Sequence, residues 1–164
     1  MGKQAGSQSR TPATALLERL GVTFTIHSYP HDVRAQGYGM EAAHALGTDP
    51  ARVFKTLLAR VDDRLVVAVV PVAASLDLKA LAGVLGGKRA AMADPGDAER
   101  STGYVLGGIS PLAQRRRLPT VVDESALQHR TVLVSGGRRG LEVELASAAL
   151  VAATEAVTAP IARS

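Results

Sequence analysis

The chain has 164 residues, 46% of them hydrophobic, which suits one globular domain with its own core and does not call for a second domain. It contains no cysteine, so disulfides, thiolate metal sites and a cysteine nucleophile are excluded. The formal net charge of +4 favours an anionic partner, and an aromatic content of 3% argues against bases stacked on a broad aromatic surface.

The N-terminal segment, residues 1–10, is polar and rich in glycine and serine, which predicts a disordered tail ahead of a domain at 11–164. This segment has no apolar run typical of a signal peptide, and no stretch reaches membrane-spanning length. The sequence therefore predicts a cytoplasmic protein without a membrane partner. The four histidines lack the spacing of metal ligands, so no metal or other cofactor is expected.

The predicted elements are short helices and strands. Thr11 can cap a helix whose first position is Pro12, and Gly21 can end it. The turn at 62–64 between two apolar runs predicts an antiparallel hairpin. The elements expected in chain order are a helix at 12–20, a strand at 22–29, a loop at 37–39, a helix at 40–46, strands at 53–61 and 65–70, helices at 78–85 and 95–100, strands at 120–122, 131–135 and 141–145, and a helix at 146–156.

Several strands with few β-α-β spacings favour an α/β (α+β) fold. We expect a mixed, largely antiparallel, barrel-like sheet with surrounding helices, in a single domain.

Lys55 lies in a predicted strand that is apolar on both faces, which is typical of a central, covered strand. An ammonium group there is costly to bury, and its pKa can shift. The chain uses arginine for most of its cations, so a lysine at this position suggests a function. The alternative is a structural lysine whose stem packs while its head reaches water.

Two glycine-rich segments could bring backbone N–H groups close to a ligand. The first, Ser101–Pro111, could bind an anion or a developing oxyanion, and the second is Ser135–Gly140. Arginines accompany both, and their guanidinium groups suit phosphates. The residues that could follow an RNA backbone are Lys88, Arg89, Arg115, Arg116, Arg117, Arg138 and Arg139. Tight loops and solvated surface charge are the structural alternatives.

Seven segments together resemble the YbaK/EbsC family, free-standing relatives of the editing domain of bacterial prolyl-tRNA synthetase. They follow one another through nearly the whole chain after residue 10. The matching segments are 11–13, 27–29, 53–58, 92–95, 100–104, 107–112 and 134–141, of which Lys55-Thr56-Leu57-Leu58 and Gly107-Gly108-Ile109-Ser110-Pro111 are the most specific.

The resemblance implies a trans-editing deacylase that removes cysteine from Cys-tRNA(Pro), with Cys-tRNA(Cys) as a further candidate substrate. The family's account is substrate-assisted, because the cysteine thiol attacks its own ester and leaves as a thiolactone. The partners implied are the aminoacylated 3′ end of tRNA and prolyl-tRNA synthetase, with no DNA. The site residues implied or inferred are Lys55, Gly107, Gly108 and Ile109 for catalysis, and Tyr29, Ser110, Pro111, Ser135, Gly136 and Glu142 for substrate binding.

Within this site Lys55 is expected to anchor the terminal adenosine or the aminoacyl group, and the N–H groups of 107–109 are expected to stabilise the oxyanion. Glu142 departs from the aspartate of the well-known bacterial member by one methylene.

Other functions stay open at this point. Sister branches of the family clear alanine and other small residues. A non-catalytic tRNA-binding module and a small phosphate binder are alternatives from other classes.

Overall fold

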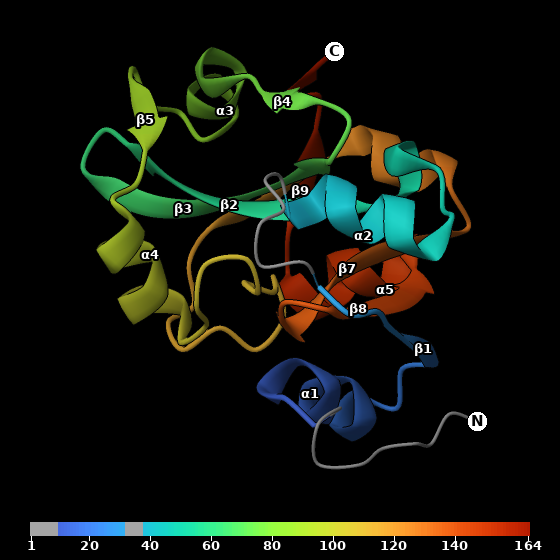
Figure 1. Ribbon diagram of the computed structural model, residues 1–164. Coiled ribbons are helices and arrows are strands. Elements are labelled where there is room, and N and C mark those ends of the chain that lie inside the picture. The colour runs from blue at the N-terminus through green and yellow to red at the C-terminus, as the bar shows by residue number, and fades with distance from the viewer. Residues whose placement is uncertain (1–9, 32–37) are drawn as a thin grey trace.

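The computed structural model describes residues 10–31 and 38–164 (Figure 1). The predicted tail at 1–10 therefore lies outside the described residues except for Arg10, and so does the first residue of the predicted loop at 37–39. Among the described residues, no helix is long and apolar enough to cross a membrane.

The first helix begins and ends where the sequence predicts. In α1 (Pro12–Leu20) the Thr11 hydroxyl oxygen accepts a hydrogen bond from the Thr14 N–H at 3.1 Å, and the Thr14 hydroxyl oxygen accepts one from the Thr11 N–H at 3.0 Å. Gly21 ends the helix in the left-handed conformation, with φ 69°. The Thr11 hydroxyl also donates to the Gly136 carbonyl at 2.5 Å, which ties the start of α1 to the second glycine segment.

The larger sheet is built around the predicted hairpin of β2 (Phe54–Val61) and β3 (Arg64–Pro71). Antiparallel pairing runs without interruption from Phe54 opposite Pro71 to Val61 opposite Arg64. Seven of the eight β3 residues are buried, as in a strand covered on both faces. The sheet order is β5-β2-β3-β6-β9, with β5 (Ala90–Met92), β6 (Thr120–Asp123) and β9 (Val157–Ala159).

A second, antiparallel sheet has the order β1-β8-β7. It consists of β1 (Phe24–Ser28), β7 (Thr131–Arg138) and β8 (Leu141–Ala146). A third pairs β4 (Ser75–Leu76) with β10 (Ala162–Arg163). The sequence did not predict β4, β5, β9 and β10, because strands of two or three residues are too short to show an alternating pattern.

Four further helices lie close to their predicted ranges, and two of them start at the predicted caps. Asp77 accepts from the Ala80 N–H at 3.0 Å, and Asp94 accepts from the Gly96 N–H at 3.0 Å. The helices are α2 (Tyr38–Leu46), α3 (Leu78–Val84), α4 (Pro95–Thr102) and α5 (Ser147–Thr154), with 3-10 turns at Pro50–Arg52 and Glu124–Gln128.

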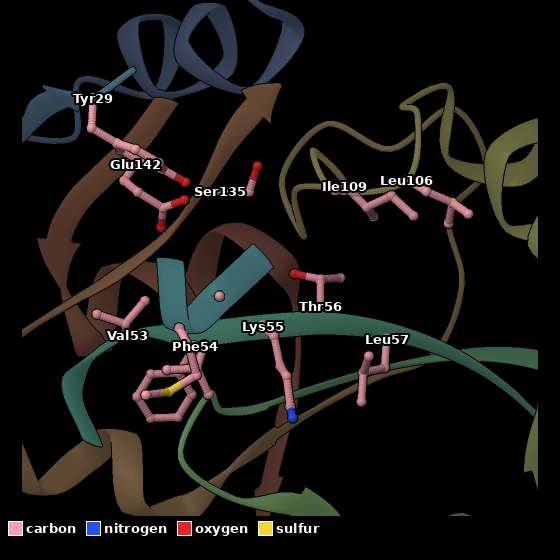
Figure 2. A pocket seen from close by; sticks show the side chains of 14 residues that line it. Tyr29, Val53, Phe54, Lys55, Thr56, Leu57, Leu106, Ile109, Ser135 and Glu142 are labelled. Carbon is pink, nitrogen blue, oxygen red and sulfur yellow. The ribbon is translucent and has the colours of Figure 1, made fainter. Parts of the chain in front are cut away.

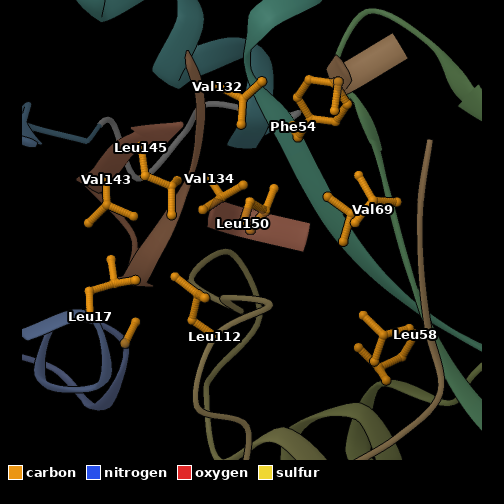
Figure 3. Close-up of a cluster of buried hydrophobic side chains, with 14 of the residues drawn as sticks. Leu17, Phe54, Leu58, Val69, Leu112, Val132, Val134, Val143, Leu145 and Leu150 are labelled. Atoms are coloured by element: carbon orange, nitrogen blue, oxygen red, sulfur yellow. The ribbon is translucent and has the colours of Figure 1, made fainter. Parts of the chain in front are cut away.

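The hydrophobic core lies on both sides of the larger sheet. Figure 1 shows α3 on one side and β7, β8 and α5 on the other. The cluster between the two main sheets includes Leu58 of β2, Val134 of β7 and Leu150 of α5, together with Leu112 of the loop before β6 (Figure 3). Leu112 is fully buried and therefore anchors that loop. Across the sheet, Leu81 of α3 packs on the opposite face of β3.

The fold is the predicted mixed α/β single domain with a largely antiparallel arrangement. Of the strand pairs in the described chain, only β3 with β6 and β6 with β9 are parallel. The strands form three sheets and no closed barrel in this part of the chain, so the barrel-like closure is not confirmed.

Candidate functional site

A cavity of about 400 Å³ opens where β2 and β7 separate. Val53, just before β2, forms an isolated parallel bridge with Leu133 of β7. Beyond it β2 pairs with β3, and β7 pairs with β8. The cavity is lined by Tyr29, Gly39, Met40, Val53, Phe54, Lys55, Thr56, Leu57, Val72, Leu106, Gly107, Ile109, Ser135 and Glu142. Its size is in the range of small-ligand sites.

Glu142 is the buried acid of this cavity. It lies on β8 opposite Ser135 of β7 and is only 7% exposed. Its side-chain carboxyl group has no hydrogen-bond partner among the described residues. Burial raises the pKa of Glu142 to about 8. The carboxyl group is therefore mostly protonated at neutral pH in the unliganded protein, and a cation that enters the cavity would favour the carboxylate.

Tyr29 adds a hydroxyl group to the same wall. Burial, and after it the charges of Glu142 and Glu41, raise the pKa of Tyr29 to about 12. The phenol is therefore a hydrogen-bond donor over the whole physiological range. Figure 2 shows Tyr29, Glu142 and Ser135 together on one side of the cavity, with Ile109 and Leu106 across from them.

The first glycine segment lines the cavity with only part of its predicted length. Gly107, with φ 86°, and Ile109 are lining residues, and neither backbone N–H has a partner among the described residues. Gly108 is not a lining residue, and its N–H donates to the Val105 carbonyl at 2.9 Å. The predicted oxyanion donor at Gly108 is therefore incorrect, because that N–H closes a turn.

Gly108 has a different role, which is to allow close packing of the two glycine segments. A Cβ atom at Gly108 would lie 2.5 Å from the Arg138 Cα and 2.8 Å from the Arg139 nitrogen. No side chain larger than hydrogen fits without a backbone shift. The loop at 106–109 is thus held against the β7–β8 hairpin, which fixes Gly107 and Ile109 beside Ser135.

Lys55 and Thr56 lie on opposite faces of β2, as neighbours in a strand must. In Figure 2 the Thr56 hydroxyl points toward the Ser135 and Ile109 side of the cavity, whereas the Lys55 ammonium points away on the other side of the strand. Burial lowers the pKa of Lys55. The Thr56 Oγ1 is buried and has no hydrogen-bond partner in the described chain. Of the two residues, Thr56 thus presents its polar group to Glu142 and Ser135.

Three predicted substrate contacts do not line the cavity. Ser110 is fully buried, and its hydroxyl oxygen accepts from the Leu112 N–H at 3.2 Å. Pro111 is buried beside it, outside the lining. Gly136 packs on Leu141, and its carbonyl accepts from Thr11. In this structure all three residues shape the loops behind the cavity rather than its wall, and their contact with substrate stays a prediction.

The predicted basic residues are spread over several surfaces. Lys88 and Arg89 donate backbone N–H groups to the Asp62 carboxylate at 3.2 and 3.1 Å, which places them at the tip of the β2–β3 hairpin. Arg115, Arg116 and Arg117 are exposed in the loop before β6, and Arg138 is exposed near the end of β7.

Arg139 differs from these exposed cations. It forms an ion pair with Glu41 of α2 at 3.3 Å, and the Arg139 and Glu41 side chains are only 17% and 11% exposed. Its guanidinium group therefore has an internal role between α2 and the β7–β8 hairpin, and its assignment to tRNA stays a prediction.

Sequence reasoning missed several lining residues, above all Thr56, Met40 and Leu106. Thr56 lies in the same strand segment as Lys55, and only the lysine was predicted as a site residue from the sequence. Because neighbouring residues of a strand point to opposite faces, the sequence could have indicated that the Thr56 hydroxyl lies on the face opposite Lys55. Met40 and Leu106 are each 46% exposed, and only the folded chain shows that they flank the cavity.

The cavity has no activated protein nucleophile in the described part of the chain. No histidine lines it, and no Ser–His or Cys–His pair is possible there. The described residues also contain no group of three or more potential metal ligands. What the cavity offers is a set of backbone and hydroxyl donors, a lysine, a buried acid and an apolar wall.

Comparison with known proteins places these features in context. Residues 36–153 match the family described as the aminoacyl-tRNA editing domain. A candidate Cys-tRNA(Pro)/Cys-tRNA(Cys) deacylase of Enterococcus faecalis, EbsC, is 40% identical over 121 residues, which are 73% of this chain and 73% of that protein.

Two solved structures share the fold. One is the crystal structure of a candidate trans-editing enzyme for prolyl-tRNA synthetase, with a TM-score of 0.84 and 24% identity, covering 98% of this chain and 100% of that one. The other, of a hypothetical protein, has a TM-score of 0.83 and 25% identity, covering 93% of this chain and 100% of that one.

Proposed function

The chain belongs to the aminoacyl-tRNA editing domain family, and from this premise we propose that it is a trans-editing deacylase that removes cysteine from mischarged Cys-tRNA(Pro). Cys-tRNA(Cys) is the second substrate of the proposal, because the 40% identical relative is named for both. The proposed domain covers residues 11–164. The observation that carries the proposal is the cavity itself, where the segments typical of the family meet around Glu142.

The proposed reaction uses the substrate's own nucleophile. The cysteine sulfur attacks the ester carbonyl carbon and forms a carbon–sulfur bond, while the bond from that carbon to the ribose oxygen breaks. The thiol proton passes to the ribose oxygen, so the products are tRNA and a cyclic thiolactone, which water then opens to cysteine. This route is supported by the lack of an activated nucleophile among the described lining residues.

The protein's share of this reaction is to bind and orient the ester. The N–H groups of Gly107 and Ile109, which have no partner in the described chain, are suited to the developing oxyanion. One such donor is typically worth about 10²- to 10³-fold in rate. The buried carboxyl of Glu142 is suited to the substrate's α-ammonium group, whose charge favours the carboxylate form.

The apolar part of the wall, which includes Val53, Phe54 and Ile109, is suited to a small uncharged side chain. A site of this kind distinguishes amino acids that differ by one small group by only about 1 to 3 kcal/mol. Alanine is therefore the main competitor of cysteine.

Lys55 keeps its proposed role as an anchor for the terminal adenosine, on the far side of β2 from Thr56. The proposal agrees with a half-buried lysine that belongs to the cavity lining and whose ammonium group points to the other side of β2 (Figure 2). Lys79 on the exposed part of α3 is the matched control, because it lies outside the cavity. Lys55→Ala should slow deacylation, whereas Lys79→Ala should leave it unchanged. Equal rates for the wild type and Lys55→Ala would remove Lys55 from the mechanism.

A panel of charged tRNAs tests the function. Cys-tRNA(Pro), Cys-tRNA(Cys), Ala-tRNA(Pro) and Pro-tRNA(Pro) are incubated with the protein, and loss of the ester is followed over time. We expect the two cysteinyl substrates to be cleared faster than the alanyl one. Faster clearance of Ala-tRNA(Pro) would move the protein to the alanine branch.

Ser-tRNA(Pro) tests the route, because it differs from Cys-tRNA(Pro) only by oxygen in place of sulfur. A thiol-assisted reaction should leave it largely intact, whereas equal rates would point to attack by water.

A further inference from the structure

A second concave surface lies at the other end of β2. It is a groove of about 530 Å³ that we call the arginine groove, and its walls come from the β2–β3 hairpin, α4 and the loop before β6. Five arginines line it: Arg60, Arg64, Arg100, Arg116 and Arg117. Two acidic residues, Asp63 and Asp97, line it as well.

Asp97 organises part of this charge without neutralising it. Its carboxylate accepts from Arg60 at 3.0 Å and from Arg100 at 2.5 Å, so two guanidinium groups share one carboxylate. A guanidinium has five N–H donors, and most of those on Arg60 and Arg100 remain available. The pairing therefore fixes the orientation of two cations at the groove wall.

The remaining arginines are less neutralised. Arg117 pairs with Glu155 at 3.0 Å on an open surface, where such a pair is weak. Arg64 and Arg116 form no ion pair within the part of the chain that the structure describes. Backbone bonds nevertheless hold Arg116 in place, since its N–H donates to the Ser101 carbonyl of α4 at 2.9 Å. The groove thus has an excess of positive charge on a fixed frame.

The groove is connected to the cavity through two segments. Thr56 in the cavity and Arg60 in the groove lie on the same face of β2, four residues or about 13 Å apart. The loop that contributes Gly107 and Ile109 to the cavity contributes Arg116 and Arg117 to the groove. One strand of a stacked duplex rises about 3.4 Å per nucleotide along its axis, so this separation corresponds to a few nucleotides.

We propose that the arginine groove binds backbone phosphates of the tRNA acceptor strand, a few nucleotides away from the aminoacyl end held in the cavity. The inference rests on the proposed deacylase function and gives its substrate a second anchoring point. Arginine suits this ligand because its planar fork matches the oxygens of a phosphate. Contacts of this kind supply affinity and position without reading the base sequence.

The test compares the double variant Arg64→Ala/Arg116→Ala with Arg19→Ala/Arg130→Ala. The first pair removes the two groove cations that have no internal ion pair in the described chain, so folding should be preserved. The control pair removes two exposed arginines outside the groove, at the same cost in net charge. Binding of uncharged tRNA is measured as a function of salt concentration for both variants and the wild type.

Loss of two phosphate contacts should make the negative slope of log K against log salt shallower by about 1.8 and weaken binding about 10- to 30-fold at 0.15 M salt. The control pair should bind within about threefold of the wild type. Deacylation of full-length Cys-tRNA(Pro) should show a raised KM in the groove variant, while a short cysteinyl ester of adenosine should be cleaved at the wild-type rate, because it cannot reach the groove.

The two proposals fail in different ways. If the wild type clears the tRNA ester but the groove variant binds and clears it equally well, the groove proposal is wrong and the deacylase stands. If no ester is cleared, the deacylase proposal is wrong, and the salt dependence of tRNA binding still decides the groove. An unchanged slope in the groove variant overturns it in either case.

Discussion

Replacement of Glu142 with glutamine is expected to make the folded chain more stable and the enzyme slower. The carboxyl group is buried in the cavity without a hydrogen-bond partner among the described residues. Burial raises its pKa from 4.5 to about 8. At neutral pH the folded state therefore holds a proton that the unfolded chain would release, and this opposes folding.

The sign and size of the effect follow from the two pKa values. Because the folded-state pKa of Glu142 is the higher one, the wild type has its full stability below about pH 4.5 and loses it as the pH rises to about 8. One pKa unit is worth about 1.36 kcal/mol, so the cost at pH 7 is roughly 3 kcal/mol. Glutamine has nearly the same shape and stays neutral, so Glu142→Gln avoids this cost.

Urea unfolding of the wild type and Glu142→Gln near pH 5, 7 and 9 provides the assay. The gain in the free energy of unfolding should be small near pH 5, roughly 3 kcal/mol near pH 7 and larger near pH 9. Glu124→Gln, at an exposed site, controls for the loss of one carboxylate and should show no such trend. A gain that does not depend on pH, or a less stable variant near pH 9, would refute the reasoning.

Three further predictions concern Gly108, Thr56 and Glu144. Gly108→Ala should destabilise the fold by about 1 to 3 kcal/mol and slow deacylation, because its Cβ would meet the backbone of the β7–β8 hairpin at 2.5 Å. Gly83→Ala, in open space on α3, should not destabilise it. Thr56→Val should keep or raise stability, since it removes a buried hydroxyl without a partner in the described chain, and should slow deacylation. Glu144→Gln should lower the free energy of unfolding near pH 7 and make it fall less as the pH is lowered. The reason is that contacts to the Glu144 carboxylate, first among them the hydrogen bond from Thr131, lower its pKa.

Thermal and urea unfolding, together with single-turnover deacylation, check these three variants. Wild-type stability and activity in Gly108→Ala would show that the two glycine segments need not touch. A Thr56→Val enzyme with full activity would remove the hydroxyl from substrate binding. The depressed pKa of Glu144 gives stability above its unfolded value that is lost as the pH falls, so an unchanged acid limb in Glu144→Gln would contradict the assignment.

Local signals predicted much of the fold. Some features depend on only a few neighbouring residues and can therefore be predicted from the sequence. These are the helix cap at Thr11, the helix end at Gly21 and the hairpin turn at 62–64. The barrel-like closure was a different kind of prediction. It depends on ladder pairing between distant strands, and in the described chain Val53, just before β2, joins β7 through a single isolated bridge to Leu133.

The sequence named residues that line one cavity together with neighbours that do not. Tyr29, Lys55, Gly107, Ile109, Ser135 and Glu142 lie in its wall, and their roles stay predictions. The sequence could not tell which neighbour within a loop faces the ligand. Gly108 and Gly136 belong to the same glycine segments as the lining residues, but each is turned toward another loop. The arginine groove was hidden for a similar reason, because Arg60, Arg64 and Arg100 are scattered along the chain.

Single-turnover deacylation of Cys-tRNA(Pro) tests the central claim most directly, with Pro-tRNA(Pro) as the substrate that should be spared. The account predicts that the wild type releases cysteine well above the rate in buffer, leaves the prolyl ester intact, and loses most of this activity when Glu142 becomes glutamine. Release of cysteine at the buffer rate, or equal release of both amino acids, would contradict it.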